Sequence, residues 1–147
     1  MTVAEGQTNL DVLWAASRGE APMPPAASLL GWQPLSLERG CVRVEYIARE
    51  EWYNPQGSVQ GGFIAAMLDE AMSSTTIIAS NVTMNAPTLE MKVSFLRPLF
   101  VGKATAEARI LKWGRSTCFI EAELFDPQGQ LVAKASATQA PKPFKRF

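Results

Sequence analysis

The sequence predicts an α+β fold in which an antiparallel β-sheet wraps around one long central helix. Residues 61–80 form a helix-length segment that is apolar on nearly every side until Asp69, and a helix that is apolar all round is buried. Five other segments alternate apolar and polar residues with a period of two, as strands with one buried and one wet face do in antiparallel sheets. The chain of 147 residues is long enough for one such domain.

The first 28 residues are expected to form an N-terminal arm ahead of this domain. Residues 1–8 are polar and are expected to be loose. Residues 9–18 predict a short amphipathic helix capped by Asn9. Residues 19–28 contain one glycine and three prolines, which indicates a connector. Residues 29–37 then lead into the first clear strand, in which Val42, Val44 and Tyr46 alternate with charged residues.

One face of the predicted helix is made of small residues and an acid. Spaced at the helical period, it comprises Gly62, Ala65, Ala66, Asp69, Ser73 and Thr76. Such a face permits close approach of a ligand or of a twin helix, and ordinary tight packing is the alternative.

Four further strands are expected after the helix. They lie at residues 89–95, 104–110, 117–124 and 131–137, and a turn at residues 126–129 precedes the last one. Many inward positions hold alanine, which suits a sheet pressed closely against a helix. The domain is expected to span residues 29–140. Residues 141–147 form a basic tail for which a solvated terminus is expected rather than a phosphate site.

Composition excludes several classes of chemistry. The chain contains no histidine, so Ser-His-Asp and Cys-His nucleophile systems and histidine-ligated zinc cannot be built. Cys41 and Cys118 lie in strand-like segments and are predicted to be buried thiols of a reducing compartment, not a disulfide or metal site. The 14 basic and 14 acidic residues balance, so no strong field attracts nucleic acid or an anionic membrane. With neither a signal peptide nor a membrane-spanning run apparent, a cytoplasmic location is expected.

Residues 54–70 carry the strongest functional signal. A turn leads into the pair Gly61 and Gly62, which opens the helix that carries Asp69. Free backbone amides at a helix start favour negative charge, and a carboxylate inside an apolar helix is costly unless it has a partner or a task. The two features together indicate chemistry on a carbonyl group.

The chain resembles the hot-dog-fold acyl-CoA thioesterases of the phenylacetate-degradation (PaaI-like) type over roughly residues 30–140. Asn54, Gly57, Gly61, Gly62 and Asp69 fall at the family spacing, and residues 86–88, 95–98, 114–115 and 126–133 also look like the family. Gln60 stands where the family commonly has histidine. No imidazole can act there, and any role of Gln60 is restricted to amide hydrogen bonds.

The resemblance implies an acyl-CoA thioesterase that needs no cofactor beyond its coenzyme A substrate. The Gly61 and Gly62 amides would stabilise the charge that develops on the carbonyl oxygen. Asp69 would attack the carbonyl or activate water. Asn54 would orient water or the carbonyl from its loop, and a plain turn residue is the alternative.

Three more positions are candidates of lower weight. Ser73 would contact substrate or water, although a hydroxyl bonded back to the helix is favoured. Thr88 matches a family position that holds the attacking water. Arg115 matches a position near the CoA phosphates, with a solvated strand-edge arginine as the alternative. Glu70 is expected to be a structural ion-pair partner. Four aromatics would line an acyl pocket or pack in the core: Trp32, Trp52, Tyr53 and Trp113.

Helix geometry predicts a dimer. Asp69 lies eight residues beyond Gly61, which is about 12 Å along a helix axis, so one carbonyl cannot touch both groups of the same helix. Two antiparallel helices would bring Asp69 of one chain beside Gly61 of the other. We therefore expect two composite sites at a two-fold interface, in a homodimer or a dimer of dimers, with acyl-CoA as the partner molecule.

Two other functions remain open on the same fold. One is a non-catalytic acyl-CoA binding or sensing protein, to which the missing motif histidine gives weight. The other is a hydratase or dehydratase, which is disfavoured because those sites usually use histidine.

Overall fold

The computed structural model describes residues 9–144. The elements are α1 (Asn9–Ser17), α2 (Pro25–Leu30), β1 (Gln33–Glu38), β2 (Cys41–Ala48), the 3-10 helix η1 (Glu50–Trp52), α3 (Gly61–Ala79), β3 (Met84–Asn85), β4 (Thr88–Phe95), β5 (Gly102–Trp113), β6 (Cys118–Phe125), β7 (Leu131–Gln139) and β8 (Lys142–Pro143). The expectation for residues 1–8 lies outside the described residues.

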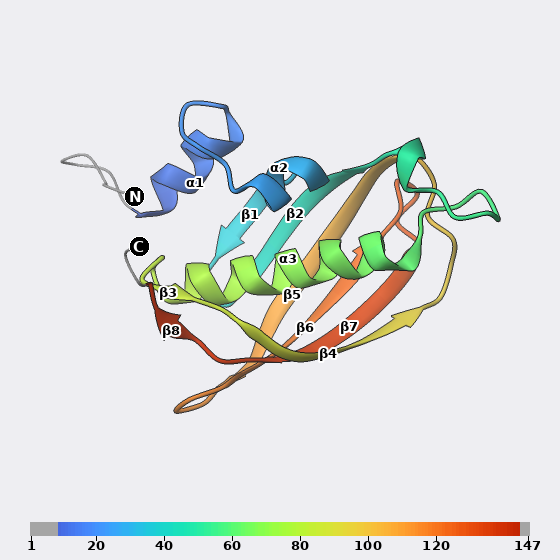
Figure 1. Cartoon of the computed structure of the whole chain (residues 1–147). Coiled ribbons are helices and arrows are strands. Elements are labelled where there is room, and N and C mark those ends of the chain that lie inside the picture. The colour runs from blue at the N-terminus through green and yellow to red at the C-terminus, as the bar shows by residue number, and fades with distance from the viewer. Residues whose placement is uncertain (1–8, 145–147) are drawn as a thin grey trace.

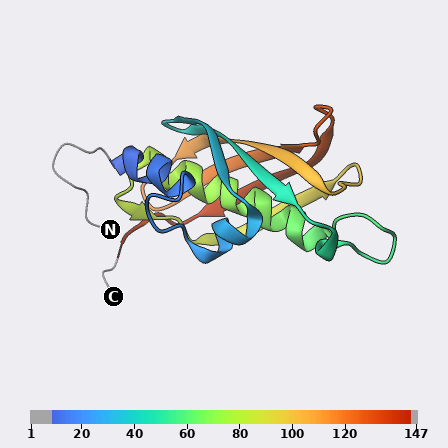
Figure 2. The ribbon, with the colours of Figure 1, turned by 90° about the horizontal axis from the view of Figure 1, so that it is seen from above.

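Six strands form one sheet in the order β1-β2-β5-β6-β7-β4, and every neighbouring pair is antiparallel. Figures 1 and 2 show α3 lying lengthwise across one face of this sheet, with α1 and α2 on the side of β1 and β2. The predicted α+β architecture with one long central helix is therefore confirmed. Within residues 9–144, no helix is both long and apolar enough to cross a membrane.

The core lies between α3 and the sheet. Val42, Val44 and Tyr46 of β2 are fully buried, as their alternation predicts. The inward positions of β5 are the alanines 104, 106 and 108, each at most 1 % exposed. Since alanine keeps the two layers close, larger side chains of α3, such as Met67 and Leu68, fill the space and are fully buried.

The N-terminal arm is more ordered than the sequence indicates. The helix expected at residues 9–18 is present as α1, and the Asn9 side-chain amide donates to the Asn81 carbonyl at 2.7 Å. Part of the segment predicted as a connector folds as α2, because Pro25 occupies a first-turn position where proline is tolerated. The helix ends at Gly31, whose φ of 70° is left-handed.

The edges of the sheet also differ from expectation. β1 was not identified as a strand, because a bulge between Pro34 and Ser36 breaks its alternation. At the other end of the chain, Lys142–Pro143 pairs with β3 as β8, inside the segment predicted as a tail.

The prediction that both cysteines are buried is wrong for Cys41. Cys118 is buried, whereas Cys41 is exposed at the start of β2. Inward Val42 sets the alternation of this strand, so Cys41 falls on the outer face of the sheet.

Candidate active site

The loop before α3 is folded by Asn54. Its side-chain oxygen accepts hydrogen bonds from the backbone amides of Gln56 at 3.0 Å and Ser58 at 3.2 Å, and its amide donates to the Ser58 hydroxyl at 3.3 Å. Gly57 completes the turn with a φ of 81°. Asn54 therefore organises the loop, as the turn alternative predicts, and it also lines the same depression as Gly61.

Gln60 caps the start of α3. Its side-chain oxygen accepts a hydrogen bond from the Gly62 amide at 2.6 Å, which satisfies one of the amides that a helix start leaves unpaired. Within residues 9–144, the Gly61 amide has no hydrogen-bond partner. Of the two amides that the sequence indicates, only that of Gly61 is free to receive an oxygen from a ligand.

The depression beside Gly61 has a volume of about 360 Å³ and walls of mixed polar and apolar character. It is lined by Asn54, Ser58, Val59, Gly61, Ile64, Phe95, Leu96, Arg97 and Pro98. A Cβ at Gly61 would lie 3.2 Å from the Phe95 ring, so glycine allows this aromatic ring to cover the helix start.

Asp69 is held by a chain of side-chain hydrogen bonds from two strands. The Thr88 hydroxyl of β4 donates to Asp69 Oδ1 at 2.7 Å. Gln139 of β7 donates from Nε2 to the Thr88 hydroxyl at 3.3 Å and to the Ser73 hydroxyl at 3.1 Å. The Thr76 hydroxyl donates to Gln139 Oε1 at 2.5 Å. The structure thus brings together Asp69, Ser73 and Thr88 from the predicted set.

Gln139 was missed by the sequence analysis, although a signal for it exists. The inward positions of β7 are alanines until residue 139, where the same alternation places a fully buried amide. A buried polar group in an apolar alternation indicates a hydrogen-bonding task. Ser73, for which a bond back to its own helix was favoured, instead accepts from Gln139.

Glu70 is not the ion-pair partner that the sequence indicates. Within residues 9–144 it forms no salt bridge, and its partner is the Ser74 hydroxyl, which donates to Oε1 at 3.1 Å. Burial raises the pKa of Glu70 above its ordinary value, the Ser74 hydrogen bond acts in the opposite direction, and the charge of Asp69 raises it further.

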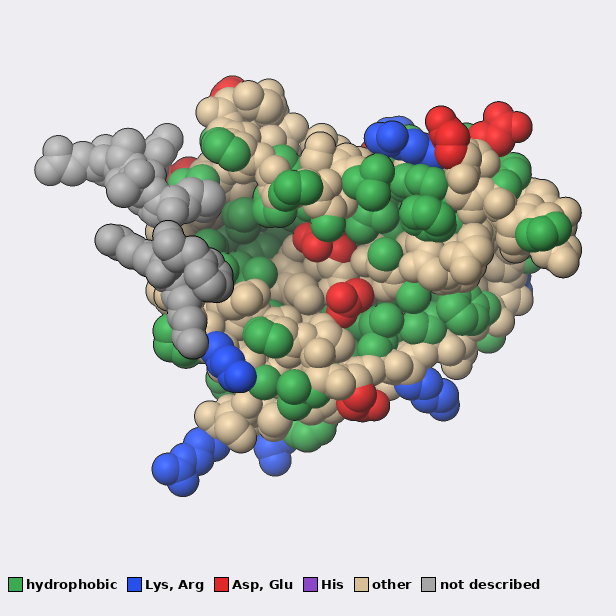
Figure 3. Space-filling view, viewed as in Figure 1, with side chains coloured by type: hydrophobic (Ala, Val, Ile, Leu, Met, Phe, Trp, Pro, Cys, Tyr) green, Lys and Arg blue, Asp and Glu red, His purple; other side chains and the backbone are tan. Residues whose placement is uncertain are grey.

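The phenol of Tyr46 shares the electrostatic surroundings of the two acids. Its hydroxyl is buried without a hydrogen-bond partner within the described chain. Burial raises the pKa of Tyr46 well above its usual value, and the negative charges of Glu70 and Asp69 add to this. Figure 3 shows acidic side chains in the hollow at the middle of the face seen in Figure 1, amid apolar and uncharged surface, with basic side chains toward the edges.

The other candidates lie apart from these groups. Arg115 is exposed in the turn between β5 and β6 and does not line the depression beside Gly61. Trp32 and Trp52 are buried, and Trp52 stacks on Phe63 with ring centroids 4.7 Å apart. Trp113 is 42 % exposed. The Tyr53 hydroxyl accepts a hydrogen bond from the Val101 amide. None of these four aromatics lines the depression beside Gly61.

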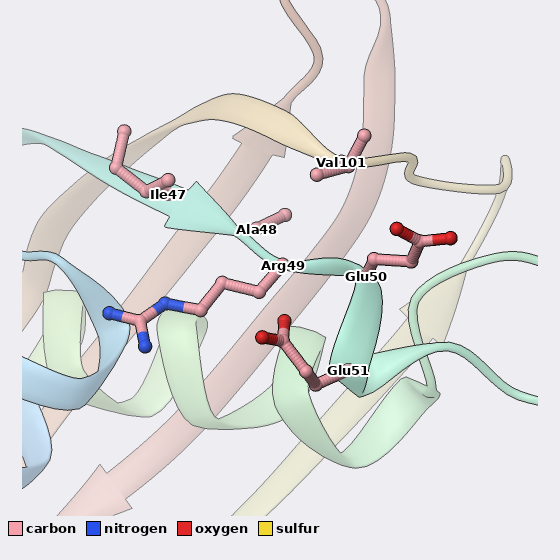
Figure 4. A pocket seen from close by; sticks show the side chains of 6 residues that line it. All are labelled: Ile47, Ala48, Arg49, Glu50, Glu51 and Val101. Atoms are coloured by element: carbon pink, nitrogen blue, oxygen red, sulfur yellow. The ribbon is translucent and has the colours of Figure 1, made fainter.

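A second depression of about 690 Å³ lies near the end of β2. It is lined by Ile47, Ala48, Arg49, Glu50, Glu51 and Val101. Figure 4 shows the carboxylates of Glu50 and Glu51 pointing in different directions, and the Arg49 guanidinium lies 5.7 Å from the Trp52 ring centroid. Within residues 9–144, no group of His, Cys, Asp and Glu is suited to hold a metal ion.

The family model and the relatives that match this chain point to the same family. The family model described as the thioesterase superfamily matches residues 56–133. A proposed esterase of Saccharolobus solfataricus is 33% identical over 101 residues, which cover 69% of this chain and 71% of that protein.

Solved structures show the same similarity. A proposed thioesterase of Ralstonia eutropha JMP134, described as a phenylacetic acid degradation-related protein, is 34% identical with a TM-score of 0.80, and the match covers 88% of this chain and 98% of the other. The Escherichia coli PaaI protein shares the fold with a TM-score of 0.77 at 22% identity, covering 90% and 94%. A Streptococcus mutans protein bound to acetyl-CoA also shares it, with a TM-score of 0.70 at 23% identity, covering 78% and 91%.

Proposed function

Since the chain belongs to the thioesterase superfamily and has the hot-dog fold of PaaI-like thioesterases, we propose that it hydrolyses an acyl-CoA thioester to a free acid and CoA. The observation that carries the proposal is the hydrogen bond by which Thr88 of β4 holds the Asp69 carboxylate of α3. The acetyl-CoA bound by the related Streptococcus mutans protein supports a CoA thioester as the substrate.

Gly61 supplies the charge stabilisation in this proposal. Water or a carboxylate adds to the thioester carbon, and the carbonyl oxygen becomes an oxyanion. The unpaired Gly61 amide at the positive end of the α3 dipole is placed to receive it. One preorganised donor of this type contributes about 3–4 kcal/mol to the transition state. Asn54 lies at the same depression and orients the substrate carbonyl or water there.

Asp69 supplies the base or the nucleophile. Oδ1 accepts the Thr88 hydrogen bond, so Oδ2 is the oxygen that takes a proton from water or attacks the carbon directly. When water is the nucleophile, the tetrahedral adduct breaks its C–S bond, and the sulfur leaves as the CoA thiol with the proton that Asp69 took from water. When Asp69 attacks directly, breaking the C–S bond leaves an acyl–Asp69 anhydride and the CoA thiolate. Water then hydrolyses the anhydride to the free acid, which restores Asp69, and a proton released by this water converts the thiolate to the thiol. Both routes require the same ionised oxygen at the same place, and Ser73 adds a hydroxyl on the same helix face.

Two chains complete the site in this proposal. Gly61 and Asp69 are about 12 Å apart along α3, so a composite site needs a second helix. β4 is an edge strand, and Leu89, Phe95 and Leu96, on or just after it, are each more than half exposed. An apolar edge strand is a surface that a second copy can cover. We therefore propose a homodimer, with a dimer of dimers as a further step of assembly. Arg115 binds CoA phosphate at the rim of the composite site.

A non-catalytic acyl-CoA binding protein is the second candidate. The observation in its favour is that Gln60 occupies the histidine position and is engaged in capping Gly62. Such a protein would use the same depression but would release no thiol.

The test is thiol release from acyl-CoAs of graded chain length and aromaticity, measured for the wild type, Asp69→Asn and the neighbouring control Glu70→Gln. We expect Asp69→Asn to lower kcat by about 10²–10⁴-fold, the usual contribution of a general base, with the molecular mass in solution and Tm retained. Glu70→Gln should keep kcat within about threefold, because Glu70 has no role in the proposed reaction.

Two results would contradict the proposal. Tight acyl-CoA binding by the wild type without thiol release would support the binding protein instead. Wild-type turnover by Asp69→Asn would remove Asp69 from the mechanism.

A further inference from the structure

We propose that Gln139 is a positioning residue that directs the hydroxyl proton of Thr88 onto Asp69 and thereby fixes the Asp69 carboxylate. The inference rests on the proposed function, since Gln139 acts through a residue that the proposal makes catalytic. Gln139 is fully buried at the end of β7 and touches neither the Gly61 depression nor solvent.

The directions of the hydrogen bonds follow from counting donors and acceptors. An ionised carboxylate only accepts, so Thr88 must donate its single proton to Asp69. The oxygen of Thr88 can then meet Gln139 only as an acceptor, so the Gln139 group that faces it must be Nε2. The amide oxygen consequently points the other way, toward Thr76, which donates to it. Only this one arrangement satisfies every member of the chain.

The arrangement is anchored in three elements. Thr76 belongs to α3, Gln139 to β7 and Thr88 to β4. Both N–H groups of Gln139 are engaged, one with Thr88 and one with the Ser73 hydroxyl. A buried amide is stable only when its groups are paired. The Gln139 amide therefore cannot rotate without breaking bonds to both layers of the fold.

Loss of the Gln139 donor would leave the direction of the Thr88 hydroxyl unfixed. Without the N–H that occupies its oxygen, the Thr88 hydroxyl can rotate toward other acceptors, and Asp69 loses its fixed donor at 2.7 Å. Misplacing a reacting group by about 1 Å costs about 10²-fold in rate. Substrate affinity should change little, because Gln139 does not line the depression beside Gly61.

The experiment is a double-mutant cycle on the full chain, using Gln139→Met, Thr88→Val and the double variant. Each single substitution should lower kcat by about 10- to 100-fold and leave KM within about twofold. Because Gln139 acts through Thr88, the double variant should be no slower than Thr88→Val alone. Thr88→Ser keeps the hydroxyl and should recover most of the kcat that Thr88→Val loses.

The chain offers a matched control on the neighbouring residue of β7. The Thr138 hydroxyl donates to Glu90 at 2.9 Å, which is also a threonine–carboxylate pair between β7 and β4, but an exposed one. Thr138→Val should therefore leave kcat unchanged. If Gln139→Met does not fold, Thr76→Val tests the same point, since it removes the donor that orients the amide, and it should lower kcat while KM is retained.

Two results would overturn the inference. One is a double variant whose loss of kcat equals the product of the two single losses. The other is a Gln139→Met protein whose Tm falls while kcat stays at the wild-type value. Its failure is distinguishable from failure of the proposed function. If Asp69→Asn is inactive and Gln139→Met is not slowed, only the positioning role fails. If Asp69→Asn turns over like the wild type, or the wild type releases no thiol, the proposed function fails and this inference falls with it.

Discussion

Asp69 and Glu70 are adjacent on α3, yet they lie in different surroundings. Asp69 faces β4 and β7, and its donor, Thr88, comes from the sheet. Glu70 bonds to Ser74, one turn further along its own helix, and interacts electrostatically with the buried Tyr46 of β2. The comparison shows that the position of each carboxylate depends on which element supplies its hydrogen-bond donor. A donor from another layer fixes a carboxylate relative to the sheet, whereas one from the same helix fixes it only relative to that helix.

The electrostatic surroundings of Glu70 disfavour its charged form. Burial raises the pKa of Glu70, and the charge of Asp69 raises it further. A raised pKa does not by itself make a carboxylate a poor base, because enzymes raise carboxyl pKa values toward the working pH, so the hydrogen bond from Thr88 is what distinguishes Asp69. We therefore regard Glu70 as a partly buried acid without a catalytic role, whose burial lowers the stability of the folded state. Asp69 is the acid that the sheet holds in place.

The largest effect that tests this comparison is expected from altering the length of each acid. Asp69→Glu keeps the charge but adds a methylene, which displaces the carboxylate from Thr88. A displacement of this size should lower kcat by about 10²-fold. Glu70→Asp shortens the neighbouring acid and should leave kcat within about threefold. Steady-state thiol release measures both, and equal losses in the two variants would show that the two acids do not differ in role.

A smaller effect concerns stability and its pH dependence. Because the folded-state pKa of Glu70 is raised above its ordinary value of 4.5, the folded state holds this proton more tightly than the unfolded state. The contribution of Glu70 to stability is therefore fully present below pH 4.5 and is lost as the pH rises through the folded-state pKa. Glu70→Gln cannot ionise and should have a higher Tm than the wild type at neutral pH.

Thermal melts of the wild type and Glu70→Gln at several pH values measure this difference. The difference should shrink as the pH falls toward 4.5, because the wild-type carboxyl becomes neutral there. A constant difference across that range would mean that the stabilisation does not arise from the charge.

The fold was largely predictable because its strongest determinants are local and periodic. The inward alternation of β2 and the all-round apolar character of α3 identify the sheet, the helix and their packing directly. β1 was missed because its bulge between Pro34 and Ser36 breaks the period. The burial of Cys41 was predicted wrongly because successive residues of a strand point to opposite faces. Val42 points inward, so Cys41 points outward.

The groups around Asp69 were predictable where they lie in the contiguous motif or, like Thr88, at a position that the family resemblance matches. Gly61 and Asp69 stand in one segment, so their spacing can be taken directly from the sequence, and their catalytic roles stay predictions. Gln139 lies 51 residues after Thr88 in the chain, and only the pairing of β4 with β7 brings the two together. Sequence periodicity does not encode which strands are neighbours. The engagement of Gly62 by Gln60 likewise depends on a side-chain conformation that the spacing does not determine.

The smallest expected effect is at the start of α3, where Gln60 caps the helix. Gln60→Ala removes the acceptor of the Gly62 amide and should destabilise the protein by about 0.5 kcal/mol, the lower end for loss of an N-terminal cap on an exposed helix end. Gln56→Ala is the matched control, because Gln56 contributes only its backbone amide to the loop. Gln60→His should retain wild-type kcat if the family resemblance, which implies histidine at this position, holds for this chain. Thermal melts and thiol release separate two roles for this side chain. A fall in Tm with kcat retained identifies Gln60 as a helix cap alone. A fall in kcat with Tm retained would show that its amide contacts the substrate and that the Gly61 end of α3, like the Asp69 end, uses a side chain as well as backbone.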